Sequence, residues 1–168
     1  MVTDLDEMTL RVSDFAGKCA EKLRSDGTAA YSVGVFIQTN RFRDDLPQYF
    51  PNASVRLDVP ANNTQEIISA ALRALRMVFK SGFEYKRAGV TVFDIVEADA
   101  IQTTLFDFDQ EFRDRDDRIS KVMDQFNTSG KNLLRLATQR PGHYSDGIRR
   151  EFCSPLFTTS WSDLLEIK

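Results

Sequence analysis

Apolar residues recur at helical spacing in two stretches of the first hundred residues. The first stretch predicts a helix over residues 7–25, because its apolar residues follow one another at steps of three or four: Met8, Val12, Phe15, Cys19 and Leu23. The second stretch predicts a helix over residues 63–80. Asn63 can cap that helix, and Glu66 three residues later completes a pattern like the capping box.

Alternating apolar and polar residues predict strands over 31–39 and 54–59, and an almost continuous apolar run predicts a third over 88–96. We expect the third strand to be the more central one, because strands buried on both faces have apolar residues on both. The resulting order is helix, strand, strand, helix, strand. It is typical of an α+β, ferredoxin-like split β-α-β domain whose first strand is missing or truncated, with both helices on one sheet face. The first strand of such a domain would have to precede Thr3, but only two residues do. We therefore expect that the chain begins inside a larger protein.

The pattern changes at residue 98. A mixed charge run between 107 and 118 is typical of a solvated linker or helix face, and it is followed by a predicted short helix over 119–126 and a strand over 133–138. The last residues, 154–165, are apolar enough to dock on another surface. We therefore divide the chain into one domain over 1–97 and, over 98–168, a linker followed by a small α/β tail.

Composition indicates a folded protein without a membrane span. Of the 168 residues 42% are apolar, and no run of about 18 apolar residues occurs. The start has neither the basic nor the apolar region of a signal peptide, so we expect a cytoplasmic protein. Its two cysteines, Cys19 and Cys153, are then expected to be free buried thiols.

Catalytic chemistry is not apparent in the sequence. The single histidine, His143, has no metal-ligand partners nearby, and no nucleophile, phosphate-binding or dinucleotide motif occurs. We therefore expect no catalytic residue, no metal and no cofactor, and the fold's versatility alone is weak support for a small enzyme.

The sheet face opposite the helices is expected to be open and polar. Side chains on this face and at the neighbouring strand ends are candidates for contacts with nucleic-acid phosphates: Thr39, Asn40, Arg41, Arg43, Ser54, Arg56, Lys86 and Arg87. Residues 1–97 hold 12 Lys and Arg against 13 Asp and Glu, so any DNA binding by this region alone should be weak. The alternative is an ordinary solvated surface.

A short peptide after the third strand has the pattern of a docking motif. It reads Gln102-Thr103-Thr104-Leu105-Phe106, in which Leu105 and Phe106 can enter an apolar pocket of a partner while Gln102 bonds at the rim. The alternative is a strand end whose Leu105 and Phe106 join the core.

Several of these segments resemble one known family. The helix end at 20–24, the helix over 65–79, the strand start at 85–90, the peptide at 102–106 and the tail at 154–165 are similar to the C-terminal part of UmuC-type, Y-family lesion-bypass DNA polymerases. The resemblance covers nearly the whole chain and implies a role in SOS mutagenesis and DNA repair.

The resemblance also implies a role for each part of the chain. Residues up to about Val96 would be the little finger, which grips primer-template duplex DNA, and Gln102, Leu105 and Phe106 would bind the bacterial sliding clamp. The tail would contact other proteins, such as accessory mutagenesis proteins. The palm, fingers and thumb are absent from this sequence, so the chain is expected not to polymerise, and Mg²⁺ would belong to the missing palm.

A second hypothesis needs no DNA. A ferredoxin-like regulatory or assembly domain would dimerise or bind a protein through its sheet edge, and residues 102–106 would then belong to the core.

Overall fold

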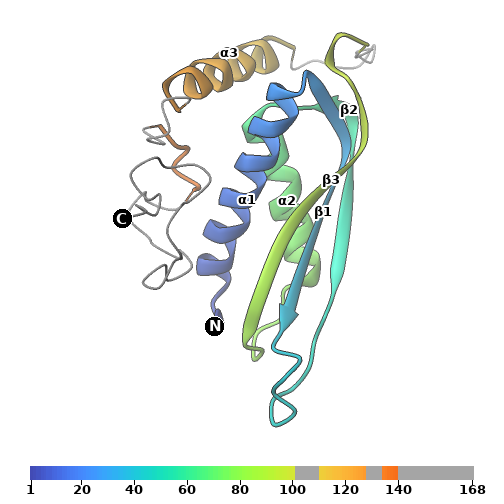
Figure 1. Ribbon diagram of the computed structural model, residues 1–168, viewed down its shortest axis with the longest axis vertical. Helices are drawn as coiled ribbons and strands as arrows, with labels where there is room; N and C mark the ends of the chain where they lie inside the picture. The colour runs from blue at the N-terminus through green and yellow to red at the C-terminus, as the bar shows by residue number, and fades with distance from the viewer. Residues whose placement is uncertain (101–109, 128–133, 140–168) are drawn as a thin grey trace, which may run out of the picture.

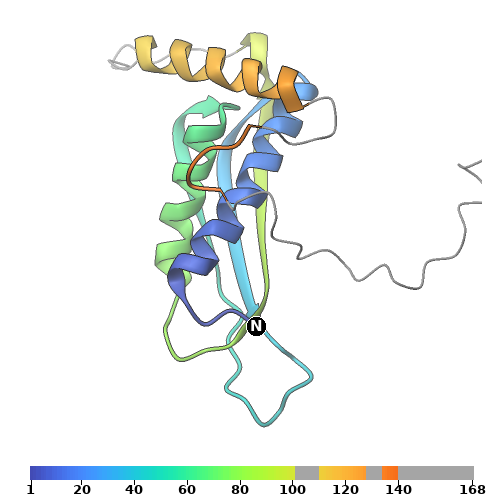
Figure 2. The ribbon, with the colours of Figure 1, turned by 90° about the vertical axis from the view of Figure 1, so that its left-hand side faces the viewer.

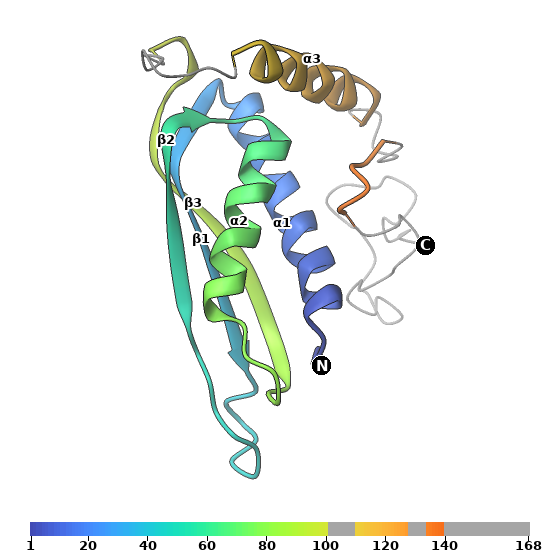
Figure 3. The same cartoon turned by 180° about the vertical axis from the view of Figure 1, so that it is seen from behind.

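The computed structural model describes residues 1–100, 110–127 and 134–139 (Figure 1). Its elements in chain order are α1 (Leu5–Ser25), β1 (Thr28–Thr39), β2 (Asn52–Ala61), α2 (Thr64–Val78), β3 (Tyr85–Glu97), a 3₁₀ turn (Ala98–Ala100) and α3 (Gln110–Asn127). Helices α1 and α2 lie side by side on one face of the sheet, as Figure 2 shows from the helix side and Figure 3 from behind. The α+β, ferredoxin-like class with both helices on one face is therefore confirmed.

The three strands form one antiparallel sheet in the order β2-β1-β3. Val33 of β1 pairs with Val55 of β2 on one side and with Val92 of β3 on the other. The expectation that the third strand is the central one was wrong, because β1 holds that place. The apolar run of β3 misled the prediction, since Phe93 and Ile95 within it are exposed to solvent.

A remnant of the front strand is present as one bridge. The amide of Val2 donates to the carbonyl of Tyr85 at 2.9 Å, and the amide of Tyr85 donates back at 2.8 Å. The pairing lies on the outer edge of β3. Within the described residues, the rest of that edge has no backbone partner.

Both long helices begin at a capping side chain. The Asp4 carboxylate accepts hydrogen bonds from the amides of Asp6 and Glu7, each at 3.1 Å, so α1 begins two residues before the predicted start. Asn63 caps α2 as predicted, with its side-chain oxygen 2.8 Å from the amide of Glu66.

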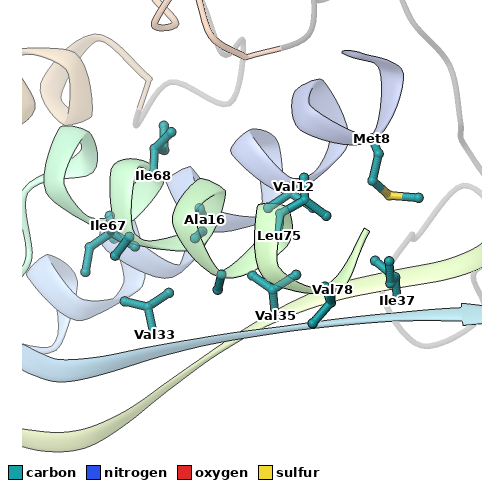
Figure 4. Close-up of a cluster of buried hydrophobic side chains, with 14 of the residues drawn as sticks. Met8, Val12, Ala16, Val33, Val35, Ile37, Ile67, Ile68, Leu75 and Val78 are labelled. Carbon is teal, nitrogen blue, oxygen red and sulfur yellow. The ribbon is translucent and has the colours of Figure 1, made fainter. Parts of the chain in front are cut away.

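The core lies between the two helices and the inner face of β1 (Figure 4). Its fully buried side chains come from all three elements: Met8, Val12, Ala16, Val33, Ile37, Ile67 and Leu75. The prediction of the buried face of α1 was partly wrong. Ala16 and Ala20 are fully buried, whereas Phe15 is 38% exposed and Cys19 is a half-buried free thiol.

Helix α3 crosses the end of the layer formed by α1 and α2 (Figure 2). It begins at Gln110 and so includes part of the charge run expected to be a linker or helix face. The strand expected over 133–138 is wrong for the described part, because residues 134–139 form a turn that lies against α1.

Candidate nucleic-acid interface

The sheet face away from α1 and α2 is called the open face here. Residues alternate between the two faces of a strand, so this face carries every second residue. The register places Ser32, Arg56 and Phe93 in one row across the sheet, and Gly34, Ser54 and Thr91 in the next. Further along come a row with Phe36 and Gly89 and a row with Gln38 and Arg87: the open face is a mixed polar, aromatic and cationic surface.

Two glycines let aromatic rings lie flat on the open face. A Cβ at Gly34 would stand 3.0 Å from the ring of Phe93, and a Cβ at Gly89 would clash with the ring of Phe36. Glycine within a strand weakens it, so its presence often marks a close approach of this kind. Both rings therefore occupy space that a side chain on the neighbouring strand would otherwise need.

Several of the candidate residues lie together at one end of the sheet. Gln38 at the end of β1 pairs with Arg87 near the start of β3. Lys86 Nζ lies 3.5 Å from the side-chain oxygen of Asn40, which opens the loop between β1 and β2. Lys86 and Arg87 are exposed, and within the described residues neither forms an ion pair.

The loop over residues 40–51 is held in shape from inside. The side-chain amide of Gln48 donates to three backbone carbonyls, those of Asn40, Arg43 and Leu46, at 2.8–3.2 Å. Thr39 is buried, and its hydroxyl oxygen accepts a 3.1 Å bond from the amide of Tyr49. Thr39 is therefore placed to support the loop, while a phosphate would meet the exposed residues beside it.

The two arginines of this loop already have contacts. Arg41 lies over the ring of Phe50, 4.9 Å from its centroid. Arg43 forms two hydrogen bonds with the carboxylate of Asp45, at 2.7 and 2.6 Å. These bonds lower the pKa of Asp45 and raise the pKa of Arg43. The pair is exposed, and such pairs are weak in water, so a phosphate could replace Asp45 at little cost.

Arg56 lies at the other end of the open face with a carboxylate beside it. Six residues of β1 separate its row from that of Arg87, which is about 20 Å at the rise of a strand. Asp94 accepts a 2.8 Å bond from the Ser32 hydroxyl and lies 3.3 Å from Arg56, whose guanidinium also lies 5.1 Å from the Tyr31 ring centroid.

Sequence reasoning missed Asp94, which stands in an apolar run and has a φ of 56°. Left-handed backbone is uncommon for residues other than glycine and has no clear sequence signal at this position. Asp94 offsets the charge of Arg56, so the positive potential of the open face is concentrated at the other end, around Lys86 and Arg87.

Several of the predicted residues lie outside the part of the chain that the structure describes. The peptide with Gln102, Leu105 and Phe106 lies outside the described residues, as do Cys153 and His143. Within the described ranges no three His, Cys, Asp or Glu side chains form a group that would hold a metal ion. No helix in that part of the chain is long and apolar enough to cross a membrane.

Two family models match the chain in succession. Residues 1–105 match the impB/mucB/samB family C-terminal domain, and residues 117–167 match a domain of unknown function, DUF4113.

Individual relatives match almost the whole chain. Protein UmuC of Salmonella typhimurium is 34% identical over 168 residues, covering 99% of this chain and 39% of the relative. Protein ImpB of the same species is 33% identical and Protein MucB of Escherichia coli 32%, each over 163 residues, 97% of this chain and 38% of the relative. The chain therefore spans less than two fifths of the length of these relatives. With the first model matched over residues 1–105, the chain belongs to the impB/mucB/samB family, and the α+β domain described above is that family's C-terminal domain.

Proposed function

We propose that residues 1–97 act as the little finger of an error-prone lesion-bypass DNA polymerase and hold primer-template duplex by its phosphates. The observation that carries the proposal is the group of exposed cations, Arg41, Lys86 and Arg87, gathered at one end of an open sheet face beside a preformed loop. The polymerase activity would reside in the part of the relatives' length that this chain does not cover. In this proposal the chain acts in the cytoplasm without a cofactor of its own.

The contacts would be independent of sequence. Phosphate oxygens accept bonds from arginine, lysine, serine and asparagine side chains, and these contacts position a protein on a duplex without reading its bases. Arg43 and Arg56 would join by exchanging Asp45 or Asp94 for a phosphate, and Asn40 and Ser54 would add neutral bonds. Because residues 1–97 carry a net charge of −1 (12 − 13), the affinity of this region alone should be low and fall steeply with salt.

Reversing two charges is expected to weaken the DNA binding strongly. Lys86→Glu/Arg87→Glu removes two cations from the loop end of the open face and adds two anions. Fluorescence anisotropy with a labelled primer-template at low salt should show binding by the wild type and at least about a tenfold loss in the variant, with a shallower dependence on salt.

A matched control lies on the helix side of the same domain. Arg73 and Arg76 are exposed on α2, so Arg73→Glu/Arg76→Glu makes the same change in net charge away from the open face. Equal losses in both variants would mean that only net charge matters and would contradict an interface on the open face. No association by the wild type at low salt would contradict the DNA-binding function itself.

For the peptide Gln102–Phe106 we propose docking on the bacterial sliding clamp. Leu105→Ala/Phe106→Ala removes the two side chains that would fill the pocket and is expected to weaken clamp binding at least about tenfold, since buried aromatic and aliphatic anchors dominate such interfaces. Surface plasmon resonance with immobilised clamp measures the loss. Phe108→Ala, in the same segment but outside the motif, should bind like the wild type, and binding that survives in the double variant would exclude the motif.

Among the described residues, the outer edge of β3 has no backbone partner beyond the bridge at Tyr85, and this favours one alternative, an assembly domain that dimerises through this strand. Light scattering decides between the two. A tight dimer without DNA or clamp affinity would replace the polymerase proposal. Contacts of the tail with accessory mutagenesis proteins remain a further part of the proposal for the DUF4113 region.

A further inference from the structure

Helix α3 turns its polar side toward the rest of the protein. Most of the α3 side chains that face α1 and α2 are charged or hydrogen-bonding ones, with Ser120 buried, and half-buried Met123 is the apolar exception among the described residues. Arg113 lies 2.9 Å from Glu66, and Asp124 receives two bonds from Arg24 at 2.6 and 2.7 Å. The Ser120 hydroxyl oxygen accepts from the amide of Thr64 at 3.4 Å. The inner side of α3 therefore docks by ion pairs and hydrogen bonds.

The apolar side of α3 consequently faces outward. Phe112, Ile119 and Val122 are 59%, 45% and 47% exposed, at sequence steps of seven and three that place them in one stripe along the helix. An amphipathic helix in a folded domain normally buries this stripe. The stripe of α3, defined by these three residues, is therefore a binding surface whose occupant is not among the described residues.

We propose that the occupant is this chain's own C-terminal segment, residues 154–168, which lies outside the described residues. The segment carries apolar side chains whose spacing suits a helix or an extended docking peptide: Leu156, Phe157, Trp161, Leu164 and Leu165. The DUF4113 match runs from 117 to 167 and so joins most of α3 and this segment in one recurring unit.

The last described residues, 134–139, lie close enough to α3 for the C-terminal segment to reach it. The turn at 134–139 is fixed to α1 and α3, since Asn127 and Leu134 exchange two hydrogen bonds at 2.8 and 3.0 Å and Gln139 lies on Gly17. From Gln139 to Trp161 are 22 residues, a reach of about 70 Å when extended. Helix α3, with 18 residues, is only about 27 Å long.

The size of the stripe favours an attached occupant over a second copy. Stable interfaces between separate proteins bury about 800 Å² on each partner, which is more than three half-exposed side chains provide. A tethered segment needs less area, because the tether keeps its local concentration high. Partners for ion pairs are present on both sides: Arg115, Arg118 and Lys121 are exposed along α3 beside exposed Asp114, and the segment carries Asp163, Glu166 and Lys168.

The single tryptophan of the chain, Trp161, reports on the docking. In the wild-type chain over residues 1–168, the emission of Trp161 should be blue-shifted and its quenching by acrylamide weak. Ile119→Ser/Val122→Ser removes two of the three apolar side chains of the stripe without touching the polar side of α3. In this variant, Trp161 emission should shift to that of a water-exposed indole, and quenching should rise accordingly.

Met77→Ser is the matched control, since Met77 is exposed on α2 and its loss should leave Trp161 unchanged. Circular dichroism confirms that each variant is folded. A Trp161 that is already exposed in the wild type overturns the proposal, and so does shielding that survives in Ile119→Ser/Val122→Ser. Shielding that is lost on dilution, together with a dimer in light scattering, overturns it in favour of a second copy.

The reciprocal change tests the same contact from the other side. Leu164→Ser/Leu165→Ser in the full chain should speed amide hydrogen exchange across residues 112–126 and leave residues 1–97 unaffected. Unchanged exchange in α3 would overturn the proposal independently of the tryptophan.

Discussion

Replacing Leu75 by alanine is expected to lower the free energy of unfolding by about 3 kcal/mol. Leu75 is fully buried where α2 meets α1 and the inner face of the sheet, among Val12, Val35 and Ile37 (Figure 4). The change removes three carbon atoms from the core and leaves a cavity, which the paired strands β1 and β3 cannot move to close. Urea denaturation followed by circular dichroism measures the loss.

Met77 provides the control on the same helix. It is 69% exposed, and alanine has the better helix propensity, so Met77→Ala should leave the midpoint of unfolding nearly unchanged. A loss below about 1 kcal/mol in Leu75→Ala would mean that α2 is not docked on the sheet as described, because cavities in well-packed cores cost more than that.

The elements with a single solvated face were the ones that sequence predicted well. In β2 the inward residues Val55, Leu57 and Val59 alternate with exposed Ser54, Arg56 and Asp58, and the structure agrees with that alternation. The cap of α2 was predicted because Asn63 and Glu66 stand at the right distance before an apolar stripe. In these segments, local pattern and tertiary packing favour the same arrangement.

Prediction failed where packing depends on small or misleading residues. Ala16, Gly17 and Ala20 belong to the buried face of α1, and such small residues add little to a hydrophobic periodicity. The larger Phe15 and Cys19 were therefore assigned to that face instead. In β3 an apolar run suggested a central strand, although its residues serve the open face as well as the core.

The sequence indicates which charged residues gather at the candidate site, but not which of their charges are neutralised by neighbours. The sequence places Lys86 and Arg87 at the start of one strand and Arg41 and Arg43 after another, and antiparallel pairing brings them to one end of the sheet. The neutralisation of Arg56 by Asp94 depends on one left-handed residue in β3, and no spacing rule indicates it. Equally, the apolar stripe of α3 predicts a buried stripe, whereas its polar side makes the contacts.

The orientation of α3 depends chiefly on one arginine. The Arg24 side chain is only 10% exposed, and its guanidinium binds both oxygens of Asp124, the carbonyl of Asn62 at 2.7 Å and the hydroxyl of Thr64 at 3.1 Å. These bonds connect the end of α1, the start of α2 and α3. Arg24 therefore couples the impB/mucB/samB C-terminal domain to the DUF4113 region.

Arg24→Ala is expected to cost about 2–3 kcal/mol and to release α3. Breaking a buried pair costs about 3–5 kcal/mol because the remaining charge is left without its partner, and the partial exposure of Asp124 places this pair at or below the low end. Hydrogen exchange should rise across residues 112–127 before residues 1–97 are affected, and urea denaturation gives the overall loss. Asp124→Ala should have a similar effect, because it leaves the buried Arg24 charge without its carboxylate. The double variant should be no worse than Arg24→Ala, which already removes that contact together with the bonds to Asn62 and Thr64.

Arg43→Ala tests whether burial, and not the carboxylate pairing alone, makes Arg24 important. Arg43 binds Asp45 through two bonds of nearly the same length as those of Arg24, but both partners are exposed to solvent, where such a pair adds little. Its loss should therefore leave both the unfolding midpoint and the exchange of α3 unchanged. If Arg24→Ala also left the unfolding midpoint and the exchange of α3 unchanged, α3 would be held by the pair of Arg113 with Glu66 and by the hydrogen bond to Ser120. The coupling of the two regions would then be assigned to those contacts.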